Sequence, residues 1–128
     1  MRERTVLLLA TARYEILVHS GLLAVTAASL GDEVLVMPVL GVLKRWARAT
    51  LDLSPAEVGF PERQAALNLP PPSELFAQAK QLGARVFACD THARLAGVTS
   101  ADLSGKVDEM IALPTFWKLT AGARVLNF

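Results

Sequence analysis

Short apolar runs without polar alternation recur along this chain, and each is followed by a segment of helix length. Residues 5–10 and 33–40 are the clearest of these runs. A strand with one face in water alternates apolar and polar side chains, whereas a continuously apolar strand is covered on both faces. The pattern therefore predicts a mostly parallel sheet with helices on both sides, joined by right-handed crossovers.

The same alternation predicts the full set of elements, with glycine or proline at most boundaries. Strands are expected at residues 5–10, 33–40, 85–89, 107–113 and 124–128, and helices at 14–30, 42–50, 73–82, 91–95 and 114–121. The proline-rich segment 51–72 is longer than most loops, so a lid or interface loop is expected there, with a short helix near 62–68. Residues 1–128 are thus expected to form one three-layer α/β/α domain with five strands.

Composition and charge exclude several classes of function. The 13 basic and 12 acidic side chains leave a net charge of +1, which provides no global field for nucleic acid or an anionic membrane. The longest nearly apolar stretch, residues 16–30, is shorter than the ~20 residues of a membrane-spanning helix. A single cysteine cannot form an internal disulfide, and no signal peptide is expected, so a cytoplasmic protein is predicted.

The expected first helix, residues 14–30, is apolar on more than one side. Ile16, Leu23 and Ala27 form one stripe, while Leu17 and Val25 place apolar groups elsewhere around the helix. Such a helix needs more than one buried contact. Together with a hydrophobic content of 52%, this pattern predicts a homo-oligomer in which the second side meets another subunit.

Cys89 is the most informative residue for chemistry. It ends an expected strand and directly precedes a helix, at the carboxyl edge where parallel sheets bind ligands. Helix N–H groups and the positive end of the helix dipole favour a thiolate there, and the thiolate is the nucleophile. Arg13, Asp90, Thr91 and His92 are candidate binding residues at the same edge. The alternative is that Cys89 packs as a small apolar side chain in the core.

Other motifs give no sign of a metal or a cofactor. The two histidines and the cysteine lack the paired spacing of a zinc site. Residues 11–13 lack the glycines of a dinucleotide or phosphate loop, and no Gly-x-Ser-x-Gly elbow is present. Lys44, Arg45 and Arg48 form a basic face that is either solvated or a docking patch for an acidic partner.

Three stretches resemble the DsrE/DsrF-like family of small sulfur-relay proteins. They are residues 30–37 followed by 41–46, residues 72–76 leading to 82–89, and residues 95–98 followed by Asp102, Leu103 and Val107. The likeness spans nearly the whole chain through apolar and glycine positions, with Cys89 as the one distinctive chemical match. Residues 90–92 depart from the small or apolar residues that often follow that cysteine. The resemblance implies a flavodoxin-like fold, assembly into dimers, trimers or hexamers, and a persulfide on Cys89.

Two hypotheses of different classes follow. In the first, the protein is a sulfur carrier or sulfurtransferase-like protein, in which Cys89 accepts a sulfane sulfur and passes it to a thiol on a sulfur-carrier partner. One cysteine suffices for this relay but not for a dithiol–disulfide cycle. In the second, the protein is a non-enzymatic, oligomeric binding or adaptor protein, and Cys89 is structural.

Overall fold

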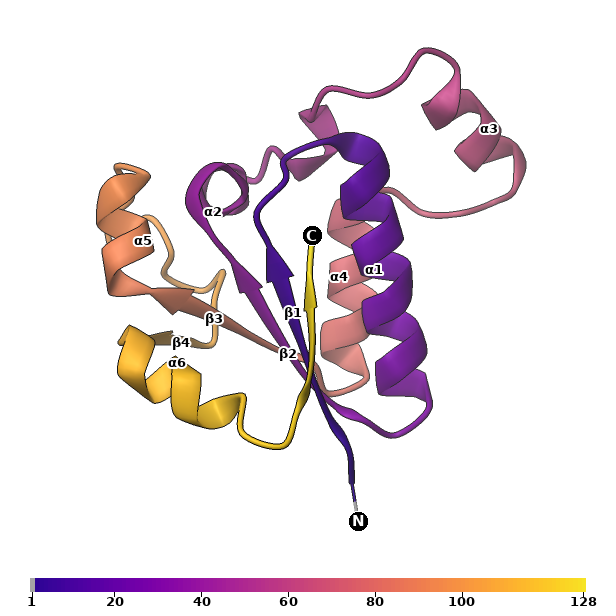
Figure 1. The fold of residues 1–128 in the computed structure, drawn as a ribbon. Coiled ribbons are helices and arrows are strands. Elements are labelled where there is room, and N and C mark those ends of the chain that lie inside the picture. The colour runs from indigo at the N-terminus through magenta and orange to yellow at the C-terminus, as the bar shows by residue number, and fades with distance from the viewer. Residues whose placement is uncertain (1) are drawn as a thin grey trace.

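A computed structural model describes residues 2–128, which form an α/β fold around a five-stranded parallel sheet (Figure 1). In spatial order the strands are β4 (Glu109–Ile111), β3 (Arg85–Cys89), β2 (Glu33–Pro38), β1 (Arg4–Leu9) and β5 (Arg124–Asn127). Each neighbouring pair is parallel, so all carboxyl ends lie at one edge. The predicted fold class is therefore confirmed. No helix among residues 2–128 has both the length and the apolar character needed to cross a membrane.

The helices divide unequally between the two faces of the sheet. On one face, called the α1 face, Leu7, Val36 and Val86 of the central strands pack in one cluster with residues of α1 (Tyr14–Ser29), α2 (Leu40–Ala47) and α4 (Pro72–Gln81). The short helix α5 (Asp90–Leu95) packs beside α2. Within residues 2–128, the opposite face, called the α6 face, carries only α6 (Leu113–Leu119), because the chain crosses back from β4 at one edge to β5 at the other.

The element bounds lie within three residues of the sequence prediction, and the largest shift is at α2, which was expected at residues 42–50 and spans Leu40–Ala47. The predicted strand 107–113 shortens to Glu109–Ile111. Before it, the Asp108 carboxylate accepts a hydrogen bond from Val86 N at 2.6 Å, and after it, Ala112 is already the N-cap of α6. The expected helix near 62–68 is α3 (Phe60–Ala66), and the short 3₁₀ helix η1 (Leu51–Leu53) precedes it.

The second apolar side of α1 is covered within the chain. It packs against α4, and the two helices lie side by side in Figure 1. Gly21 permits this close approach, since a Cβ atom there would lie 2.9 Å from the Cβ of Leu75. The second apolar side is therefore met by α4 of the same chain, which the sequence alone did not show, and the expectation of a homo-oligomer stays a prediction.

The proline-rich segment packs on the first turn of α1. Tyr14 N donates to Pro55 O at 2.9 Å, and the Tyr14 ring meets Phe60 edge-on at a centroid distance of 6.0 Å. Gln64 is buried, and its amide donates to Pro70 O at 2.5 Å, which closes α3 onto the following prolines. Figure 1 shows α3 above the end of α1 rather than over the sheet.

This packing predicts a stability change at alkaline pH. Burial raises the pKa of Tyr14 above its ordinary value, the charge of Asp52 raises it further, and a hydrogen bond with Gln64 acts in the opposite direction. Because an unfolded tyrosine ionises near pH ~10, unfolding becomes more favourable as the pH rises past that value, whereas below it Tyr14 adds no pH dependence. Tyrosinate absorbance checks this directly, since Tyr14 is the only tyrosine. Tyr14→Phe should remove the part of the loss in unfolding free energy that tyrosine ionisation causes above pH ~10. A midpoint at or below pH ~10 in the tyrosinate titration of the folded protein would contradict the expectation.

Candidate functional site

Cys89 lies where the sequence placed it along the chain, but its side chain is not open to solvent. It is the last residue of β3 and the N-cap of α5. Strand alternation puts it on the α6 face together with Phe87, in a cluster that includes Leu35, Ile111 and Phe116. Its exposed fraction is 0%. The expectation of a thiol lying open at the rim is therefore wrong for this conformation, because β4 and α6 cover that end of β3.

The four candidate binding residues do not gather around the sulfur. Arg13 is exposed in the β1–α1 loop and pairs with Glu15 at 3.0 Å, and β2 separates its strand from β3. Asp90 pairs with Arg94 at 3.2 Å on the exposed side of α5, and Thr91 is exposed. Only His92 turns toward a cavity. Among residues 2–128, no three His, Cys, Asp or Glu side chains come together as a metal site requires.

An apolar hollow of about 510 Å³ opens at the carboxyl edge of the α6 face. Its floor is formed by side chains of β1 and of the end of β2, and its wall by α6; the lining residues are Leu8, Met37, Val39, His92, Leu113, Pro114, Phe116 and Trp117. Trp117 is 76% exposed, and His92 Nδ1 is buried without a hydrogen-bond partner. Met37, Val39 and Phe116 belong to the same buried cluster as Cys89, so the sulfur is separated from the hollow by side chains that line it.

A basic groove of about 550 Å³ opens near the same edge. It is lined by Ala12, Gly41, Lys44, Arg45, Arg48, Thr50 and Leu53, which come from the β1–α1 loop, α2 and the segment around η1. The sequence showed the three cations as one basic face of a helix. The opposite wall was not foreseen, because nothing in the sequence shows that Ala12 and Leu53 lie beside α2.

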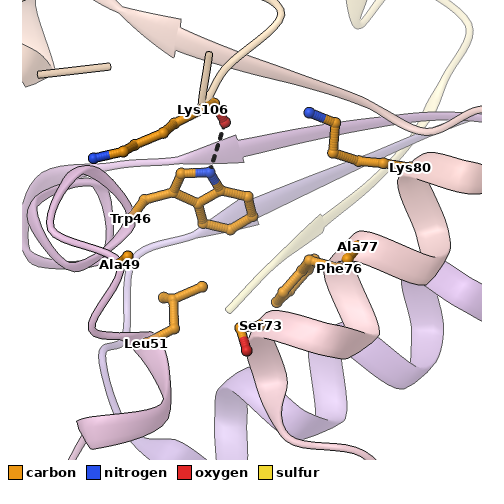
Figure 2. A pocket seen from close by; sticks show the side chains of 8 residues that line it. All are labelled: Trp46, Ala49, Leu51, Ser73, Phe76, Ala77, Lys80 and Lys106. Carbon is orange, nitrogen blue, oxygen red and sulfur yellow. Dashed lines mark hydrogen bonds between the residues drawn. The ribbon is translucent and has the colours of Figure 1, made fainter. Parts of the chain in front are cut away.

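A third pocket lies between α2 and α4 and is shown in Figure 2. Its volume is about 220 Å³, and the Trp46 and Phe76 rings line it with their centroids 5.2 Å apart. Its polar groups already have partners: Trp46 Nε1 donates to Lys106 O at 2.9 Å, and Lys106 Nζ donates to Ala47 O. Lys80 lies 3.9 Å from the Asp108 carboxylate. Little polar capacity remains to orient a ligand, so this pocket is a gap in the packing.

The junction between β2 and the first turn of α2 forms the ridge between the hollow and the groove. Val39 lines the apolar hollow, Gly41 lines the basic groove, and Leu40 between them has a φ of +49°. Positive φ is strained for a leucine, and strain of this kind concentrates at ligand sites. The two cavities on either side of this ridge are the candidate functional site.

Comparison with known proteins supports the fold alone. No protein-family model matches the chain, and no curated protein matches it either. Among solved structures, the chain is similar to BT1422, a conserved protein of unknown function from Bacteroides thetaiotaomicron, with a TM-score of 0.66 and 13% identity. The match covers 98% of this chain and 95% of that one. At this identity the similarity establishes a common architecture and carries no activity from one protein to the other.

Proposed function

We propose that this protein is a non-enzymatic binding protein that works as an oligomer and in which Cys89 is structural. One observation carries the proposal: Cys89 is fully buried, while the apolar hollow lined by side chains of the same cluster is uncovered. A nucleophile must reach its substrate, and assembly with a second subunit can only add cover over the sulfur. A cytoplasmic location belongs to the same proposal, because a single cysteine implies no oxidising compartment.

The partner that best fits the α6 face is a second copy of this chain. Parallel sheets are normally covered on both faces, yet α6 alone covers this one. Trp117, Leu113 and Val125 remain more than two-fifths exposed there, and Val125 pairs in register with Val6. Two copies that present the same apolar face can cover each other through a two-fold interface, the commonest arrangement in homo-oligomers.

Trp117→Glu is expected to dissociate the oligomer. A buried tryptophan is a typical centre of interface affinity, and a glutamate in its place leaves a charge without a partner in an apolar contact. The dissociation constant should rise at least about thirtyfold, equivalent to about 2 kcal/mol. Light scattering over a concentration series measures the change in molar mass.

Val58→Glu is the matched control for this substitution. Val58 is 95% exposed and lies in the proline-rich segment, away from the hollow, so the same change in side-chain character should leave the molar mass unaltered. A wild-type protein that is monomeric at micromolar concentration would overturn the proposed assembly. Equal dissociation by both variants would show that charge, rather than the α6 face, controls association.

Sulfur relay is the second candidate, and the position of Cys89 favours it. The residue is the N-cap of α5, although its side chain makes no hydrogen bond to that helix here, and it belongs to the cluster whose members line a hollow at the carboxyl edge. A side chain that turned toward the first N–H groups of α5 would be held as a thiolate. In the relay step, the Cys89 thiolate attacks the outer sulfur of a donor persulfide. A new S–S bond forms on Cys89, the donor S–S bond breaks, and the donor leaves as a thiolate. This route requires a local opening of α6 or α5 that exposes the sulfur.

Thiol access separates the two candidates. A relay cysteine accepts one sulfur atom from polysulfide under native conditions, whereas a structural cysteine is modified only when the protein opens or unfolds. Intact-protein mass spectrometry after native incubation distinguishes the two outcomes, and a rhodanese loaded in parallel verifies the donor.

A further inference from the structure

The basic groove concentrates positive charge that the chain itself does not neutralise. Among residues 2–128, the ion pairs within 4.0 Å leave out Lys44, Arg45 and Arg48. Nearby carboxylates have other partners: Asp52 accepts hydrogen bonds from Ser73, and Glu15 pairs with Arg13.

Over residues 2–128, two of the three cations, Lys44 and Arg48, are also not used to satisfy carbonyl groups at the end of α2. Basic side chains in a last turn often satisfy free carbonyl groups, but here Lys106 donates to Ala47 O and Arg45 to Thr50 O, the latter at 3.3 Å. In the part of the chain that the structure describes, neither Lys44 nor Arg48 donates a hydrogen bond from its side chain. Hydrogen bonds from Thr99 hold the pKa of Asp102 below its ordinary value, and the charges of Lys106 and Arg48 lower it further. Arg48 lies between the basic groove and a second pocket, which it lines together with Asp102.

We propose that the basic groove binds a small phosphorylated anion. Its volume of about 550 Å³ falls within the range of small-molecule sites, and a doubly charged phosphoryl group matches several cations better than a single carboxylate does. Arg45 and Arg48 supply planar guanidinium groups that bond two oxygens at once, and Lys44 adds a compact charge. Leu53 and Ala12 provide an apolar wall for the remainder of the molecule.

Gly41 gives the ligand access to the floor of the groove. A Cβ atom at this position would meet only the Cβ of Ala12, at 4.0 Å, so the space above the backbone is open. This inference names a ligand class for the binding function proposed above. It uses none of the residues that line the apolar hollow, so the two are tested separately.

Calorimetric titration with pyrophosphate at low ionic strength tests the inference. The wild-type chain should bind with a stoichiometry of one per chain, and Lys44→Gln and Arg48→Gln should each weaken binding about tenfold. Lys118→Gln is the matched control, because it removes one exposed cation from α6, outside the groove, and should leave the affinity unchanged. Added salt should weaken binding, since the contacts are only partly shielded from water.

Gly41→Leu provides a second variant that keeps every charge. The new side chain enters the open space of the groove at a position with ordinary φ, so the fold should persist while pyrophosphate binding is lost. Equal weakening by Lys118→Gln, or no binding by the wild-type chain, would overturn the inference. Binding of heparin without binding of pyrophosphate would also overturn it and would point to an acidic macromolecule. Light scattering of the same samples reports on assembly, so failure of one proposal does not imply failure of the other.

Discussion

In the folded protein, the Cys89 thiol is expected to react with a chromogenic disulfide reagent at least about a thousandfold more slowly than in the denatured protein. The residue has no exposed surface, so reaction requires an opening of the structure. Opening a well-packed region costs a large part of the global free energy of unfolding. An opening free energy of about 4 kcal/mol is enough to reduce the population with an exposed thiol about a thousandfold. The release of the coloured thiol over time measures the rate.

Ser100→Cys in a Cys89→Ala background is the control for reagent and ionic conditions. Ser100 is exposed in the loop after α5, so a thiol there should react at the rate of a free cysteine. Rapid native reaction of Cys89, together with the gain of one sulfur atom from polysulfide, would contradict the structural role and favour relay. Cys89→Ala should also leave assembly and pyrophosphate binding unchanged if the sulfur only packs.

Gly21→Val is expected to destabilise the protein by about 3 kcal/mol. Gly21 lies in the interface between α1 and α4, where even a Cβ atom would approach the Leu75 Cβ to 2.9 Å. That atom is fixed to the backbone of a buried residue, so the strain cannot be relieved by a rotation of its side chain. The two helices must move apart, which also loosens their packing on the sheet. Urea denaturation measures the loss in the free energy of unfolding.

Gly41→Ala and Leu75→Ala give this prediction its controls. Gly41 is also a helical glycine, but its Cβ position is open, so alanine there should stabilise the protein by up to about 1 kcal/mol. In a Leu75→Ala background, Gly21→Val should keep most of its additional cost, because alanine retains the Cβ atom that makes the shortest contact. Loss of that cost in this background would show that the crowding comes from the flexible end of the leucine instead.

The sequence predicted most of the elements because burial on both faces leaves a local signal. The apolar runs of β1 and β2 and the glycine at the end of α1 can be read without knowledge of neighbours. The pairing of α1 with α4 could not be predicted in this way. A helix that is apolar on two sides shows how many contacts it needs, not which element supplies them.

For the candidate site, the sequence alone determined that Cys89 ends a strand at the carboxyl edge and that Lys44, Arg45 and Arg48 lie together at one helix, of which Arg48 is the C-cap. Only the tertiary structure decided which groups are accessible. The strand order sends the chain from β4 back across the α6 face to β5, and that crossing buries Cys89 while it leaves the hollow beside Trp117 open. Position along a strand is a local property, whereas exposure depends on distant segments, and the two can therefore differ for the same residue.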